Sequence, residues 1–150
     1  MAFLPIAATL AAQERSGVPA APEALPGSPA PPQVIVEIQQ TVDAAVSRFD
    51  AMDMAGLLAH VSEQYRTGAL TKAAVADQLR TVFALYDQVQ ARVRVDEVRM
   101  VGERAWVYST GEVTGRLRLL GGIIPVASWE RELEVARREN GRWRLYGYQQ

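Results

Sequence analysis

The apolar residues of this chain change their spacing once, after Asp87, and this change constrains the fold more than any other feature. Before it, apolar residues recur every three or four positions, the spacing of amphipathic helices. After it, apolar and polar residues alternate one by one, as in a strand with one buried face. Helices followed by an uninterrupted series of strands predict an α+β domain, with the helices packed on one face of an antiparallel sheet.

Three helices are expected in the first part of the domain. The first carries one apolar stripe that starts at Ile35 and reaches Met52. Asp53 can cap a second, shorter helix, and Thr71 a third, because side-chain oxygens at this position accept hydrogen bonds from the first turn. Gly68 stands between them as a natural stop.

About four strands are expected in the second part, wrapped into a curved sheet that makes a cone with an internal pocket. Their expected ranges are 88–100, 104–119, 128–138 and 142–148. In the first of them the apolar parity reverses across Asp96-Glu97, which predicts a β-bulge at that point.

The Asn-Gly turn between the last two strands decides which of their side chains face inward. A two-residue loop would pair Arg138 with Trp143 and turn Glu134 to the side of Trp143. A three-residue loop would pair Val135 with Leu145 and turn both inward. Because burial should select the register that gathers apolar side chains on one face, we predict the three-residue loop.

The first 33 residues differ in composition from the rest. The run Ala2–Ala12 is apolar and ends in small residues, like the end of an export signal, although no basic residue precedes Arg15. Residues 16–33 are rich in Pro and Ala and predict an extended tether. We expect a signal-like segment and a disordered tether over 1–33, a domain over 34–150, and a periplasmic or secreted location, with a cytoplasmic one as the alternative. The apolar run is too short to span a bilayer.

Composition excludes several kinds of chemistry. The chain has no cysteine, so thiolate metal sites, iron–sulfur clusters and thiol nucleophiles are impossible. His60 is the only histidine, so no pair of histidines can bind a metal. The formal net charge of −1 gives no field that would attract a phosphate backbone. We therefore expect no metal, no cofactor and no nucleic-acid partner.

Two strings in the strand region are frequent in one protein superfamily. They are GERAWV at 102–107 and NGRWRL at 140–145. With the order of three helices before the strands over 34–150, they make the chain resemble the nuclear transport factor 2-like (SnoaL-like, cystatin-like cone) superfamily. The resemblance implies a curved sheet around an internal pocket. It says little about activity, because the superfamily includes isomerases, dehydratases, cyclases, transport factors and immunity proteins.

If the alternation holds throughout, the inner face of the sheet is mostly small and apolar. The expected inward residues of the second strand are Ala105, Val107, Ser109, Gly111 and Val113. Those of the last two strands are Trp129, Arg131, Leu133, Val135, Arg137, Trp143, Leu145 and Gly147. An isomerase-type general base needs a buried carboxylate, and none falls in these sets, which counts against catalysis.

Seven residues are candidates for lining the pocket: Tyr65, Phe83, Tyr86, Ser109, Trp129, Arg131 and Trp143. On the inner face Arg131 could hold a ligand carboxylate beside an indole, whereas near the sheet edge its head would reach water. An aromatic stripe on the outer face would suit a homodimer, as is common in the superfamily that the chain resembles. Its members are Trp106, Tyr108, Tyr146 and Tyr148.

The segment Leu117–Val126 is unusually aliphatic for a loop. It can close over the mouth of the cone, form a partner surface, or continue the hairpin and pack on the first helix.

From all these features we expect an exported, non-enzymatic domain that binds a partner or a small hydrophobic or carboxylate ligand. One alternative is an isomerase- or lyase-type enzyme acting on a hydrophobic molecule in the cone. Another is a dimerisation or protein-interaction module.

Overall fold

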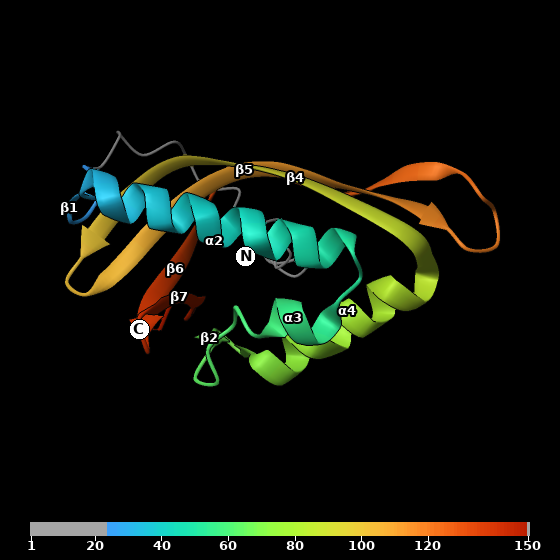
Figure 1. The fold of residues 1–150 in the computed structure, drawn as a ribbon, viewed down its shortest axis with the longest axis horizontal. Coiled ribbons are helices and arrows are strands. Elements are labelled where there is room, and N and C mark those ends of the chain that lie inside the picture. The colour runs from blue at the N-terminus through green and yellow to red at the C-terminus, as the bar shows by residue number, and fades with distance from the viewer. Residues whose placement is uncertain (1–23, 150) are drawn as a thin grey trace.

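A computed structural model describes residues 24–149 and has the expected α+β architecture (Figure 1). Helices α2 (Pro32–Asp50), α3 (Met54–Leu58) and α4 (Lys72–Leu85) lie on one side of a curved antiparallel sheet. The fold-class prediction is confirmed. The signal-like run Ala2–Ala12 lies outside the described residues, and no described helix is long and apolar enough to cross a membrane.

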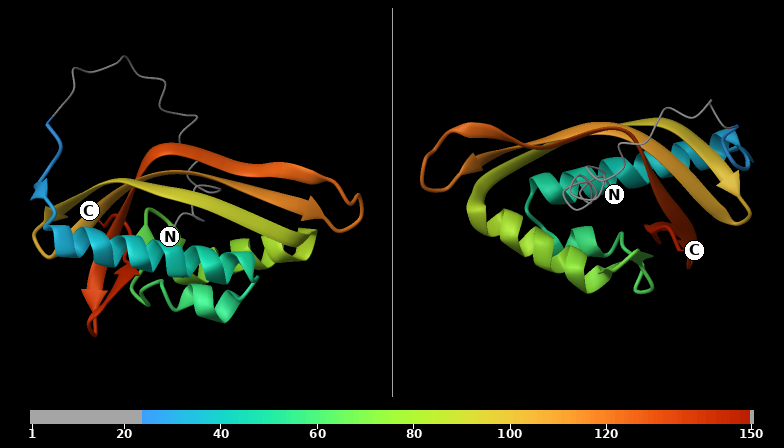
Figure 2. Two further views of the ribbon diagram at one scale, coloured as in Figure 1. Left: turned by 45° about the horizontal axis from the view of Figure 1, so that its top comes forward. Right: turned by 180° about the vertical axis from the view of Figure 1, so that it is seen from behind.

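The sheet has five strands in the order β1-β4-β5-β6-β7, and its long members curve over the helices (Figure 2). They are β1 (Ser28–Pro29), β4 (Tyr86–Val101), β5 (Arg104–Leu117), β6 (Ile123–Glu139) and β7 (Arg142–Leu145). A separate small hairpin, β2 (Arg66–Thr67) with β3 (Leu70–Thr71), precedes α4. The register of β4 against β5 shifts between Val95 and Glu97, so the bulge predicted there is confirmed.

Among the described residues, regular structure begins before residue 34, the expected start of the domain. β1 pairs with the end of β4, and the Arg99 guanidinium donates to the carbonyl oxygens of Pro26 and Gly27, each at 2.9 Å. Helix α2 then begins at Pro32, because proline at the first helical position has no N–H to leave unpaired.

The two predicted helix caps are confirmed. The Asp53 side chain accepts from the Gly56 N–H at 2.9 Å, and that of Thr71 from the Ala74 N–H at 3.3 Å. The apolar stripe of α2 is buried against the sheet through Ile38, Val42, Ala45 and Phe49.

The predicted three-residue loop between β6 and β7 is wrong. Ala136 pairs with Leu145 and Arg138 with Trp143, which leaves a two-residue loop of Asn140 and Gly141. Both loop residues have positive φ, 51° and 76°. A two-residue turn of this kind matches the twist of paired strands, and this local preference sets the register.

A bulge in β6 reverses the facing of its later residues. Trp129 pairs with Gly111, but Glu132 pairs with Ser109, so one extra residue of β6 is accommodated at Arg131, whose φ is 49°. Directly opposed residues of antiparallel strands share a face. Glu132, Glu134 and Ala136 therefore lie on the inner face with Ser109, Val107 and Ala105. The expected inward positions of Arg131, Leu133, Val135 and Arg137 are wrong, because the prediction assumed unbroken alternation.

The indole of Trp129 fills the space above Gly111. A Cβ at Gly111 would lie 2.3 Å from Cζ2 of the indole and 2.7 Å from the carbonyl oxygen of Arg92. The indole therefore lies across the sheet where no side chain stands. Its N–H donates to Ser109 Oγ at 3.1 Å, which fixes the ring.

Replacing Gly111 with alanine should destabilise the fold by about 1–3 kcal/mol, because the added methyl group forces the indole or the neighbouring strand to move. Urea unfolding followed by circular dichroism measures the change. Gly122→Ala is the matched control, since a Cβ there meets nothing within 4 Å. Equal stabilities of the two variants would contradict this account of the packing.

Candidate functional site

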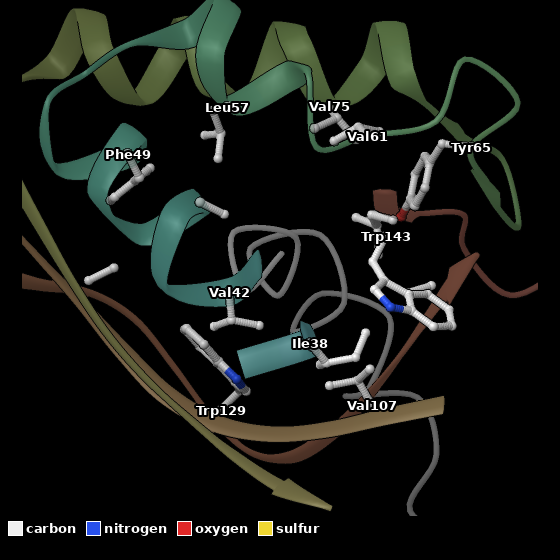
Figure 3. Close-up of a cluster of buried hydrophobic side chains, with 14 of the residues drawn as sticks. Ile38, Val42, Phe49, Leu57, Val61, Tyr65, Val75, Val107, Trp129 and Trp143 are labelled. Carbon is white, nitrogen blue, oxygen red and sulfur yellow. The ribbon is translucent and has the colours of Figure 1, made fainter. Parts of the chain in front are cut away.

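The inner face of the cone is lined by side chains from the helices and from four strands of the sheet, β4 to β7. Figure 3 shows Val42 of α2, Leu57 of α3 and Trp129 of β6 pointing toward the space between these layers. The described residues of this face belong to one buried apolar cluster, with the exception of a few polar groups. These polar groups carry whatever chemistry the interior can perform.

Glu134 is the most unusual of these groups. Its Oε2 atom is buried and has no hydrogen-bond partner among the described residues, although the residue as a whole is partly exposed. Burial raises the pKa of its carboxyl from 4.5 to about 7, and the neighbouring carboxylate of Glu132 adds to the effect. Burial also raises the pKa of Glu132. The inner face thus carries two carboxyl groups whose pKa values are raised by burial.

The expectation that no carboxyl group faces inward is therefore wrong. It rested on the three-residue loop and on unbroken alternation in β6. The sequence did contain a signal for Glu134, since the two-residue reading of the Asn-Gly turn places it on the same face of the sheet as Trp143. Nothing in the sequence marked the bulge at Arg131, which is not a glycine.

Tyr65 lies within electrostatic reach of Glu134. Burial raises the pKa of its hydroxyl to about 12, a side-chain hydrogen bond with Thr67 opposes this rise, and the charge of Glu134 adds to it. The hydroxyl is therefore a neutral hydrogen-bond donor over the whole physiological range. Of the helix-side candidates, Tyr65 is the one that the structure places near an inward carboxyl group.

The two inner tryptophans use their N–H groups within the protein. Trp143 donates to Glu37 Oε2 at 2.8 Å, and Arg138 also binds this carboxylate. The hydrogen bond from Trp143 is the main cause that lowers the pKa of Glu37, so this residue stays ionised. Trp129 donates to Ser109, as described above. Both indoles can therefore offer a ligand only their ring faces.

Phe83 and Tyr86 lie in another part of the molecule. Phe83 packs on Phe49, with ring centroids 5.5 Å apart, and the Tyr86 ring covers Gly115. Val107 of β5 pairs with Glu134, and Gly115 lies eight residues further along the same strand. The two ends of this stretch of β5 are therefore about 26 Å apart. These two rings pack the core at the far end of the sheet.

Arg131 lies on the outer face, contrary to its expected position. Its guanidinium donates to Glu97 Oε2 at 2.7 Å and lies 5.5 Å from the centroid of the Tyr108 ring. The bulge that turns Glu134 inward turns this arginine outward. It cannot hold a ligand carboxylate inside the cone.

The aromatic stripe of the outer face is largely covered by the chain itself. Tyr108 and Tyr146 are buried, and the guanidinium groups of Arg137 and Arg104 lie 4.0 and 4.8 Å from the centroid of the Tyr146 ring. Trp106 contacts Tyr148 edge to face, with centroids 5.6 Å apart. A hollow of about 210 Å³ lies beside this pair. A homodimer through this stripe stays a prediction.

The described residues contain no group of three or more acidic or histidine side chains that could hold a metal ion.

The aliphatic segment Leu117–Val126 continues the β5–β6 hairpin, as one of the three alternatives proposed. Leu119, Leu120 and Ile123 do not pack on α2, because they are strongly exposed, whereas Val126 packs against the buried cluster.

The protein is a small cone-shaped α+β domain. Three helices cover the hollow side of a curved antiparallel sheet, and a buried carboxyl group lies on the inner face between these layers. No protein-family model and no curated protein matches the sequence. Solved structures do match, and their agreement is in the fold.

One is a ketosteroid isomerase-like protein from Erwinia carotovora atroseptica, with 21% identity, a TM-score of 0.61, and coverage of 77% of this chain and 93% of that one. Another is a putative scytalone dehydratase from Novosphingobium aromaticivorans, with 14% identity, a TM-score of 0.65, and coverage of 77% and 80%. A third is a hexachlorocyclohexane dehydrochlorinase, LinA type 2, with 12% identity, a TM-score of 0.60, and coverage of 77% and 82%. The chain has the nuclear transport factor 2-like, or SnoaL-like, fold, so the fold that the resemblance implies is confirmed.

Because the pKa of Glu134 is raised, the folded protein holds a proton between pH 4.5 and about 7 that the unfolded chain has released. Stability should therefore fall as pH rises through this window, by up to about 3 kcal/mol in total. Glu134→Gln should remove this part of the pH dependence. Urea unfolding at a series of pH values measures it, with Glu103→Gln, in the exposed β4–β5 turn, as control. Parallel curves for wild type and Glu134→Gln would rule out the raised pKa.

Proposed function

We propose that the inner face binds a small, largely apolar molecule and exchanges a proton with it through Glu134, in chemistry of the isomerase or lyase type. The observation that carries the proposal is the buried Oε2 of Glu134, without a partner among the described residues, on a carboxyl whose pKa is about 7. A group with such a pKa is present in both protonation states near neutral pH, so it can serve as acid or as base.

The side chains that share the inner face with Glu134 indicate the kind of molecule. Trp129 and Trp143 have no free N–H for a ligand, so they recognise apolar surface through their rings. Polar contacts are left to Glu134, Glu132 and the neutral hydroxyl of Tyr65. A suitable molecule is therefore mainly hydrocarbon, with one carbonyl or similar polar group next to an acidic C–H bond.

A non-catalytic binder was expected because no carboxyl group was thought to face inward. Glu134 removes that reason, and the proteins of similar structure include a ketosteroid isomerase-like protein, a putative scytalone dehydratase and a dehydrochlorinase. Binding without proton transfer is the competing version. A periplasmic or secreted location also belongs to the proposal and rests on the apolar run Ala2–Ala12, with a cytoplasmic location as the alternative.

The first test is the titration of Glu134 by carbon-13 NMR on protein labelled at glutamate carboxyl groups, with Glu134→Gln to assign the signal. We expect a midpoint near pH 7. A midpoint near the ordinary glutamate value would contradict the acid–base role.

The second test is exchange of the acidic C–H protons of 2-tetralone, an apolar cyclic ketone, with deuterium from D₂O. In wild type the rate should exceed that of buffer and rise with pH through about 7, as the carboxylate form of Glu134 becomes populated. Glu134→Gln should lose about 100-fold or more of this rate, the usual contribution of a general base, whereas Glu103→Gln should lose none. Tryptophan quenching by the ketone without any exchange would favour the non-catalytic binder.

A further inference from the structure

The end of the β5–β6 hairpin projects past α4, at the end of the molecule opposite β1 (Figures 1 and 2). Residues 118–122 make the turn, beyond the pairing of Arg116 with Ile123. Three aliphatic side chains here are mostly in solvent: Leu119 is 97%, Leu120 81% and Ile123 70% exposed. Together with Leu85 at the end of α4, 53% exposed, we name them the apolar tip.

The apolar tip is held in place by main-chain hydrogen bonds. The N–H of Gly121 donates to the Leu117 carbonyl at 3.0 Å, which closes the turn. The N–H of Arg118 donates to the Leu85 carbonyl at 3.1 Å, and its guanidinium donates to the carbonyls of Phe83 and Ala84 at 2.9 and 3.0 Å. Arg118 thus satisfies the free carbonyls at the end of α4 and fixes the turn to that helix. The leucines are held outward by a defined structure.

The base of the apolar tip is positively charged. Arg116 forms an ion pair with Asp87 at 2.7 Å. Arg118 has no ion pair within residues 24–149, although its charge helps to lower the pKa of Asp87, after the larger effect of Arg116. Two arginines therefore face one aspartate. Large exposed aliphatic side chains next to positively charged residues are typical of an interaction surface.

We propose that the apolar tip inserts into the surface of an anionic phospholipid bilayer, with the arginines at its base near the lipid phosphates. Aliphatic side chains gain by entering the boundary between headgroups and acyl chains, and basic residues are attracted to anionic lipid. A bilayer also fits the shape. A stable protein interface buries about 800 Å² of surface on each partner and needs good shape complementarity. The apolar tip, in contrast, is a narrow projection with four aliphatic side chains. The inference is independent of Glu134 and of the proposed chemistry.

The test is co-sedimentation of the full chain with vesicles that contain phosphatidylglycerol and with vesicles of phosphatidylcholine alone. Wild type should bind the anionic vesicles, more weakly at high salt, and Leu119→Ser with Leu120→Ser should lower the partition coefficient at least tenfold. The matched control is Ile35→Ser with Val36→Ser, two exposed aliphatics at the start of α2. Circular dichroism verifies that both double variants fold.

Three outcomes would overturn the proposal. The first is that wild type is not recovered with anionic vesicles. The second is that both double variants bind as wild type does, which would locate lipid binding elsewhere, such as the apolar run at 2–12. The third is that, in sedimentation velocity without lipid, wild type self-associates and the leucine variant does not. In that case the apolar tip contacts a second copy of the chain.

Discussion

The bulge at Arg131 determines the direction of every later side chain in β6. Its main-chain N–H, displaced from the regular ladder, donates to Thr110 Oγ1 at 3.1 Å. The Thr110 hydroxyl in turn donates to Asp96 Oδ2 at 2.6 Å, at the bulge of β4. One threonine thus joins the two bulges across the outer face of β5. Bulges bend a strand and increase its twist, so this chain of hydrogen bonds also supports the curvature of the cone.

The same bulge exchanges the burial of two kinds of residue. Glu134, which an apolar pattern assigns to solvent, lies inside, and Val135 lies on the outer face. Val135 is nevertheless only 2% exposed, because the chain after β7 folds over it and the N–H groups of Tyr146 and Gly147 donate to its carbonyl. Both faces of the sheet are therefore covered in this region. Because both faces are covered, the carboxyl group of Glu134 can point into the interior while the apolar side chain of Val135, on the other face, stays buried.

Features that depend on neighbouring residues could be predicted from the sequence. The caps at Asp53 and Thr71, the bulge at Asp96-Glu97 and the order of helices and strands all follow from local spacing. The faces to which the side chains of β6 point could not be predicted, because its bulge has no glycine and the series from Trp129 to Val135 reads as regular alternation. The Asn-Gly turn does indicate the correct register of the last two strands. The rule that apolar residues gather on one side of a sheet favours the other register, and this rule fails where both sides are buried.

The last strand of the sheet is joined to residues far back in the chain. The N–H of Leu145 donates to the His60 carbonyl, and the N–H of Ser62 donates to the Leu145 carbonyl, both at 2.8 Å. Trp143, two residues before Leu145 in the same strand, reaches Glu37 in the second turn of α2. During synthesis, α2 and α3 are therefore made long before the strand that holds them. The hydrogen bonds that tie β7 to His60, Ser62 and Glu37 can form only when residue 145 has left the ribosome, so this end of the interior is the last to close.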